Sequence, residues 1–215
     1  MTPLTVACVL RSGGVYTPDW VLRLKRGVKR NITVPYRFVC LSDIDVPVER
    51  ILLETKWRGW WSKLELFQQL TGPTLYFDLD TVITGSLDAI ARHPHNFTAA
   101  HDYYRPQMMC STAMAWNGDF SFITKAFAAN PNGLSHEYDH KVRPRVGDQA
   151  FIEDQLAARG MKFDTFRDLF GERTIASYKV HKCEAGPPDD AAAVAFHGKP
   201  KPQDLSTGWV PALWR

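Results

Sequence analysis

One short stretch, residues 74–83, constrains the fold more than any other part of the chain. It reads TLYFDLDTVI, so four apolar or β-favouring residues lead directly into two carboxylates, Asp78 and Asp80. Gly72 and Pro73 precede the stretch and mark where a strand begins. Two acids at the end of a buried strand repel each other unless something positive lies between them, and a divalent cation is the usual solution. We therefore interpret the stretch as a buried strand whose end holds a metal ion and a diphosphate. The motif alone leaves open a capping Asp beside a surface Asp.

The bulk composition describes an ordinary soluble protein with one domain, residues 1–215. Its 215 residues can bury a sizeable core, and 45% hydrophobic with 23% charged residues is typical of a globular protein. A net charge of +3 permits an anionic substrate but does not argue for nucleic acid. We expect no leader peptide, no membrane span and a cytoplasmic location, with buried cysteines kept reduced.

The order of the expected elements indicates an α/β fold. Continuous apolar runs predict strands at residues 4–10 and 36–41, with a further short one at 51–53. Helices are expected from Thr17–Pro18 onward, over residues 63–70 with Ser62 as the cap, and over 120–129. Strands follow at 97–100, 113–116 and 191–196, whereas 130–147 is expected to be a loop and Asp148 to cap a helix through Leu156. This alternation predicts a Rossmann-like single domain with a mostly parallel central sheet flanked by helices.

The first helix is rich in basic side chains. We expect them to form a solvated face, with attraction to an anionic membrane or an anionic acceptor as the alternative. These residues are Arg23, Lys25, Arg26, Lys29 and Arg30.

A second chemical feature lies near the C-terminus, where the apolar run 191–196 ends in His197, Gly198 and Lys199. In an open α/β fold, His197 from a distant strand end can complete a cation shell begun by Asp78 and Asp80. Imidazole beside carboxylate favours Mn²⁺ over Mg²⁺. Gly198 allows close backbone approach, and Lys199 and Lys201 could reach phosphate. A His before Gly is otherwise usually a turn residue.

Together these residues resemble a known family. The motif from Phe77 to Asp80 is similar to the Asp-x-Asp motif of nucleotide-sugar glycosyltransferases, and with residues 197–200 the chain resembles glycosyltransferase family 8. The resemblance runs from about residue 4 to 202. It implies a GT-A fold, a UDP-sugar donor held through Mn²⁺ (or Mg²⁺), and transfer with retention. It also implies that His197 is a metal ligand and that Lys199 contacts the diphosphate.

Two further matches assign other site residues by resemblance. Residues 61–67 are similar to the family's helix before the acidic motif, which makes Lys63 the basic residue facing the donor. Gly147-Asp148-Gln149 resembles the Asp-Gln pair that faces the sugar and the reacting carbon, so we expect Asp148 and Gln149 to be catalytic.

The first loop departs from the family, because the sequence from Arg11 to Gly14 stands where an acidic residue usually reads uracil. We include Arg11, Tyr16 and Asp102 among the predicted substrate contacts. By position alone, Tyr103 and Tyr104 could contact a saccharide or another hydroxyl acceptor.

The expected mechanism is stabilisation of the leaving diphosphate by the metal and by Lys63 and Lys199. An amide is a poor nucleophile, so we favour attack by the acceptor hydroxyl on the leaving-group face over a covalent intermediate involving Gln149.

Three alternatives remain. The motif at Asp78 also resembles that of haloacid-dehalogenase-type phosphatases, although the later acidic pair Asp189-Asp190 lies in a Pro-rich turn. A non-catalytic sugar- or nucleotide-binding module would use the same fold. Residues 136–140 spell the zinc-protease pattern His-Glu-x-x-His, but that pattern works only on a helix, and we expect a polar loop there.

Overall fold

The fold is built on a central sheet of seven strands. The computed structural model describes residues 3–140 and 146–215. The strands follow the spatial order β3-β2-β1-β4-β7-β6-β8. Their bounds are β1 (Leu4–Leu10), β2 (Tyr36–Ser42), β3 (Glu49–Leu52), β4 (Thr74–Phe77), β6 (Phe97–His101), β7 (Met109–Trp116) and β8 (Asp164–Thr165).

The predicted mostly parallel sheet is confirmed. β1 pairs in parallel with β2 and β4, β2 with β3, and β6 with β8, whereas β7 runs antiparallel to both of its neighbours, β4 and β6. Strands β1, β2 and β4 therefore present their carboxyl ends at one edge of the sheet. The reversed β7 brings residues from its first half to that edge, since Phe77 pairs with Ala113.

A second sheet of three short strands corrects the prediction of one strand over residues 74–83. β4 stops at Phe77, and the chain re-enters a strand at β5 (Thr81–Ile83) in the order β5-β10-β9. Its partners are β10 (Ala193–Ala195), antiparallel to β5, and β9 (Ile175–Ser177), parallel to β10. Asp78 and Asp80 consequently lie in the connection between two sheets and not at the end of one strand.

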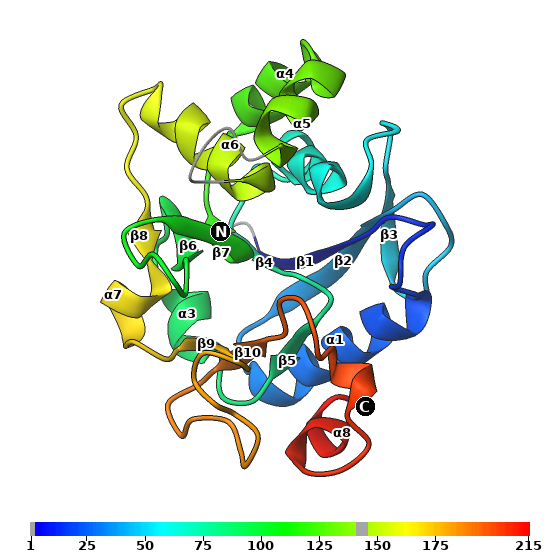
Figure 1. Ribbon diagram of the computed structural model, residues 1–215, viewed down its shortest axis with the longest axis vertical. Helices are drawn as coiled ribbons and strands as arrows, with labels where there is room; N and C mark the ends of the chain where they lie inside the picture. Colours follow the sequence, from blue (N-terminus) through cyan, green and yellow to red (C-terminus); the bar gives the residue numbers. More distant parts are fainter. Residues whose placement is uncertain (1–2, 141–145) are drawn as a thin grey trace.

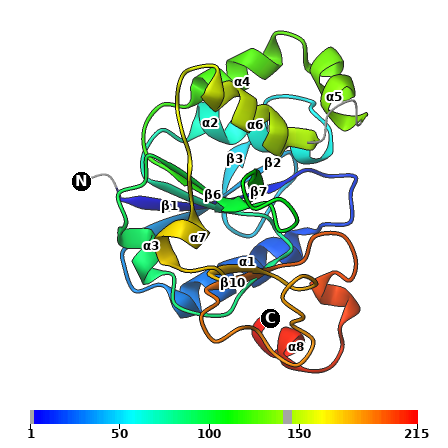
Figure 2. The same cartoon turned by 60° about the vertical axis from the view of Figure 1, so that its left-hand side comes forward.

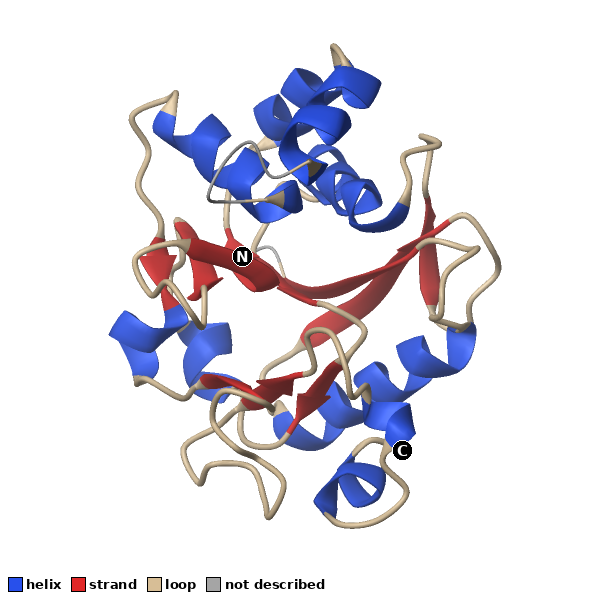
Figure 3. Cartoon of the chain, viewed as in Figure 1, coloured by secondary structure: helices blue, strands red, loops and turns tan. Residues whose placement is uncertain are grey.

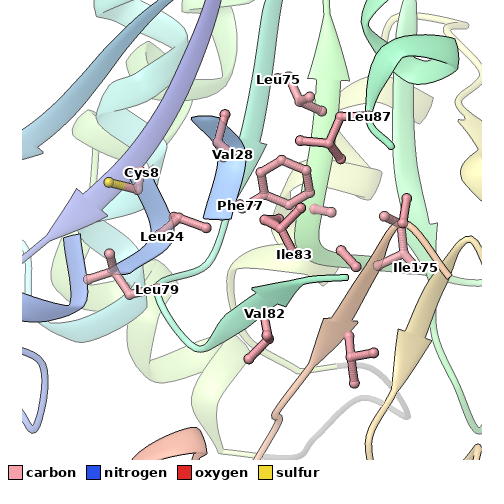
Figure 4. Packing of buried hydrophobic residues seen from close by; sticks show 14 of the residues in the cluster. Cys8, Leu24, Val28, Leu75, Phe77, Leu79, Val82, Ile83, Leu87 and Ile175 are labelled. Carbon is pink, nitrogen blue, oxygen red and sulfur yellow. The ribbon is translucent and has the colours of Figure 1, made fainter. Parts of the chain in front are cut away.

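The packing explains why the chain leaves the first sheet after Phe77. Phe77, Leu79 and Val82 all bury their side chains in one hydrophobic cluster, which lies between the central sheet, helix α1 (Pro18–Asn31) and the small sheet (Figure 4). A single straight strand would alternate its side chains between two faces. The turn at residues 78–80 allows β4 and β5 to bury side chains in the same hydrophobic cluster.

Helices cover both faces of the central sheet (Figure 1; Figure 3). On one face lie the 3₁₀ helix η1 (Gly59–Glu65) and helices α2 (Leu66–Gln69), α4 (Ser121–Ala128), α5 (Pro131–Asp139) and α6 (Gly147–Ala157). On the other lie α1 and the small sheet, with the short helices α3 (Asp88–Arg92), α7 (Phe166–Phe170), η2 (Pro202–Asp204) and α8 (Trp209–Leu213). The turned view separates these two layers clearly (Figure 2).

Three local expectations are wrong. The helix predicted over residues 63–70 begins earlier and as a tighter 3₁₀ turn, so Ser62 lies inside η1 and donates to the Gly59 carbonyl instead of capping the helix. The predicted loop 130–147 contains helix α5, because the Asn130 side chain accepts a hydrogen bond from the Gly133 amide and Pro131 occupies the first turn. Residues 141–145 of that loop lie outside the described part of the chain. Helix α6 begins at Gly147, so Asp148 belongs to its first turn and is not its cap.

Two of the basic residues on α1 hold the C-terminal helix. Arg23 donates to the Trp214 carbonyl and lies 4.4 Å from the centre of the Trp214 ring, and Arg30 donates to the Leu213 carbonyl. Part of the basic face is therefore structural, while membrane contact by the rest stays a prediction. Among the residues that the structure describes, no helix combines the length and apolarity needed to cross a bilayer.

Candidate active site

A cavity of about 910 Å³ opens at the carboxyl ends of β1, β2 and β4. Its walls come from the loop after β1, from Asp43 after β2, from the segment leading into η1, and from the acidic connection after β4. The predicted site residues on these walls are Arg11, Tyr16, Lys63 and Asp78. The volume is within the range of cavities that bind small molecules and cofactors.

Lys63 bridges two carboxylates from distant parts of the chain. Its Nζ lies 3.0 Å from Asp78 Oδ1 and 3.1 Å from Asp148 Oδ2, and its side chain is only 6% exposed. Ser111 on β7 completes the arrangement, since its Oγ accepts from Lys63 Nζ at 2.9 Å and donates to Asp148 Oδ2 at 2.6 Å. The structure therefore brings together Lys63, Asp78 and Asp148, three residues that the sequence placed in one site.

The electrostatics of this group follow from its burial. Desolvation raises the pKa of Asp78, and the Lys63 ammonium opposes that shift while Asp80 adds to it. Burial alone would lower the pKa of Lys63, but the Asp148 and Asp78 carboxylates outweigh it and raise the pKa above its ordinary value. Lys63 is thus a permanent buried cation. Tyr76, two residues before Asp78 on the same strand face, has its pKa raised by burial and donates to Asp78.

Asp80 has a separate set of partners. It accepts hydrogen bonds from the Tyr16 hydroxyl at 2.9 Å and from Lys201, whose Nζ also donates to the Phe196 carbonyl at 3.0 Å. Burial and the Asp80 charge raise the pKa of Tyr16, which keeps the phenol a donor. The Asp80 and Lys201 side chains are 8% and 14% exposed, so this is a largely buried ion pair.

The His197 ring contacts Ser177 and Tyr103. Its Nε2 lies 2.7 Å from Ser177 Oγ, and its ring stacks on Tyr103 at 5.4 Å between centroids. Burial and the nearby Lys179 charge lower the pKa of His197, so the imidazole is neutral at pH 7. A neutral imidazole is the form that binds metals.

These positions decide how the predicted metal could fit. Within residues 3–140 and 146–215, no three His, Cys, Asp or Glu side chains are grouped closely enough to hold an ion. Asp78 and Asp80 have the chemistry that a hard divalent cation requires, but each is paired with a lysine. The donor set fits the ion by type, provided that Lys201 leaves Asp80 and His197 leaves Ser177.

In the C-terminal motif, the lysine that lies in the site is not the expected one. The Lys199 side chain is 75% exposed and pairs with Asp204 at 3.0 Å, while Lys201 reaches into the site. Gly198 has a φ of 71°, a backbone conformation that favours glycine. Of these two lysines, the one that lies against the acidic motif is therefore Lys201 and not Lys199.

Gln149 and Asp102 line a small cavity of about 60 Å³ beside the N-terminus of α6. The Asp102 carboxylate accepts from the amides of Tyr104 and Arg105, and so holds the turn before β7. At the opposite end of the site, Arg11 donates to the Thr55 carbonyl at 2.9 Å and its Nε lies 3.6 Å from Asp43.

Several participants were not predicted. Tyr76 could have been found, because residues two apart on a strand share a face. Ser111 and Ser177 carry no sequence signal, since only the tertiary fold brings them to Lys63 and His197.

The zinc-protease pattern lies on a helix after all. His136 belongs to α5 and His140 follows its end, with ring centroids 4.1 Å apart. The described residues supply no third ligand beside them.

Comparison with solved structures shows that the fold is that of glycosyltransferases. The glycosyltransferase GlyE of Streptococcus pneumoniae TIGR4 superposes with a TM-score of 0.68 at 13% identity, over 100% of this chain and 59% of that one. An active-site mutant of LgtC gives 0.61 at 11% identity, over 97% and 93%, and the bifunctional WbbM gives 0.57 at 11%, over 99% and 51%. The chain thus spans little more than half of GlyE and WbbM. It matches no protein-family profile and no curated protein sequence.

Proposed function

We propose that the chain transfers a sugar from a nucleotide-sugar, in the first instance a UDP-sugar, to a hydroxyl acceptor. The observation that carries this proposal is the cavity bordered by Lys63 and Asp78, in a fold that GlyE, LgtC and WbbM share. A solved LgtC complex contains donor and acceptor sugar analogues, which supports a two-substrate site on this fold. Nothing found for this chain favours the phosphatase alternative.

The loop from Arg11 to Tyr16 and Asp43 form the part of the cavity that would take the nucleoside. The Lys63–Asp148 pair lies deeper, at the start of α6, where it would orient the sugar. Gln149 lines the small cavity and not the larger one, so its place beside the anomeric carbon stays a prediction. Lys201 would move from Asp80 to the diphosphate, which offers it more negative charge.

In the proposed reaction, the bond between the anomeric carbon and the diphosphate oxygen breaks and a bond to the acceptor oxygen forms on the same face. The acceptor proton passes to the departing phosphate oxygen, and the configuration is retained. Asp78, Asp80 and His197 would hold Mn²⁺ (or Mg²⁺), which supplies charge neutralisation for the leaving diphosphate. Lys63 and Lys201 add fixed positive charge in a partly buried place, where it is most effective.

The test combines binding with turnover. UDP-glucose and UDP-galactose, each with and without Mn²⁺, are screened for a rise in melting temperature, because a ligand that binds only the native state stabilises it. UDP release is then measured for the unaltered chain and for Asp78→Asn, with circular dichroism as the control for folding. We expect the unaltered chain to release UDP and the Asp78→Asn variant to lose this activity. If no nucleotide-sugar stabilises the protein, or if the variant keeps full turnover, the proposal is wrong. Binding without any UDP release or transfer would identify a non-catalytic module.

A further inference from the structure

A second cavity, of about 550 Å³, lies between η1, the segment before it, and helices α4 and α5. Its volume would accommodate a ligand of a few rings. Three tryptophans line it, together with polar residues of α5. The principal lining residues are Trp57, Trp60, Trp61, Asn132, Ser135 and Asp139.

The floor of this cleft is rigid. Trp61 stacks on Phe127 at 4.6 Å and donates from Nε1 to Asp139 at 3.2 Å, and Trp57 packs edge-on against Phe127 at 4.8 Å. Trp60 differs from both, because it is 56% exposed although it is the largest side-chain type. A rigid aromatic floor beside an uncovered indole forms a flat apolar surface with polar edges.

Other exposed large apolar side chains lie near the candidate active site but outside this cleft. Val15 lines the larger cavity, Val146 lines the small one with Gln149, and the Tyr104 ring lies 6.0 Å from that of His197. Leu52, on the edge strand β3, is equally exposed at 56% but lines none of these three cavities.

The two larger cavities are adjacent. Lys56, Arg58, Gly59 and Trp60 line both of them. A Cβ on Gly147 would lie 3.5 Å from Trp60 Nε1, so the indole stands against the residue that precedes Asp148. The cleft therefore opens at the end of the larger cavity where the sugar is proposed to react.

We propose that this cleft binds the acceptor, and that the acceptor is an oligosaccharide. The inference rests on the proposed function, which leaves the acceptor class open. Sugar rings have an apolar C–H face, which would lie on Trp60, and hydroxyl edges, which Asn132, Ser135 and Asp139 can bond. A peptide acceptor would make less use of flat aromatic surface.

The experiment measures saccharide and nucleotide binding separately on the full chain. Maltose, lactose and chitobiose are titrated while tryptophan fluorescence and saturation-transfer NMR are followed, and UDP binding is measured by thermal shift. The variants are Trp60→Ala, which removes the exposed ring, and Asn132→Trp, which fills the cleft from α5. Leu52→Ala is the matched control, because it removes an equally exposed apolar side chain elsewhere.

We expect at least one disaccharide to bind, and both cleft variants to weaken its binding tenfold or more while Leu52→Ala does not. Disaccharide affinities that are unchanged in both cleft variants would overturn the inference, as would binding by none of the three sugars. If the unaltered chain binds UDP-sugars in either of those cases, the cleft assignment fails and the proposed function stands. Cleft-dependent saccharide binding without any nucleotide binding would support the cleft and refute the donor.

Discussion

Replacing Lys63 by Met tests the arrangement on which the whole site depends. The substitution keeps an unbranched apolar stem but leaves the Asp78 and Asp148 carboxylates together without their shared cation. Removing one partner of a buried ion pair typically costs about 3–5 kcal/mol, because the other charge stays buried and unpaired. For a chain of this length each kcal/mol lowers the melting temperature by about 2–4 °C, so we expect a fall of about 6–20 °C at pH 8.

The pH dependence of that loss has a definite sign. Desolvation already raises the pKa of Asp78 in the folded chain, and Lys63 is the main group that opposes the shift. Without Lys63 the folded-state pKa rises further, so the folded state takes up a proton more readily than the unfolded chain does. The charged carboxylate is penalised above that pKa, and the penalty fades as the pH falls through it. The deficit of the variant should therefore be smaller at pH 5 than at pH 8.

The assay is urea unfolding of both chains, followed by tryptophan fluorescence at the two pH values. Lys199→Met is the control, because its ion pair with Asp204 involves a side chain that is 75% exposed and such pairs contribute about 0–1 kcal/mol. If Lys63→Met costs no more than Lys199→Met at pH 8, or costs more at pH 5, the bridge does not stabilise the site as argued.

Two further predictions concern the C-terminal motif. Lys201→Met should strengthen Mn²⁺ binding in the absence of nucleotide by about tenfold, or about 1.4 kcal/mol, because the Lys201 ammonium pairs with the Asp80 carboxylate that would bind the ion. Electron paramagnetic resonance of free Mn²⁺ measures the two affinities. Equal affinities would refute competition between Lys201 and the ion. Gly198→Ala should lower stability by about 1–3 kcal/mol, since φ is 71°, which strains any residue that has a Cβ. Calorimetry compares it with Gly186→Ala, where φ is not positive and the space is open, and a similar loss in both variants would contradict the reason given.

The sequence predicted the central part of the fold because its strands are buried on both faces. β1 is a nearly continuous apolar run and β2 is rich in β-favouring residues, and both patterns are typical of buried strands. The break between β4 and β5 could not be predicted, because residues 74–83 have the same local pattern whether they form one strand or two. Which sheet Thr81 joins depends on β10, more than a hundred residues away. Helix α5 was missed because Pro131 and Gly133 are typical of loops, while the capping bond from Asn130 depends on geometry.

For the candidate site, the sequence predicted which acidic residues lie together but not which C-terminal lysine lies beside them. Lys63, Asp78 and Asp148 meet as expected, because parallel strands and the start of a helix converge at one edge of the sheet. Lys199 and Lys201 differ only in position along the same loop, and nothing local decides which side chain turns inward. The His197 ring is likewise held by Ser177 on β9, and this contact depends on the pairing of strands in the small sheet.

The order of strands in the small sheet has a consequence for synthesis on the ribosome. β5 pairs with β10, and the Phe196 amide donates to the Asp80 carbonyl. A nascent chain that has emerged only as far as residue 190 has all seven central strands but no partner for β5. The acidic turn would then acquire its final shape only after the last strand had left the exit tunnel.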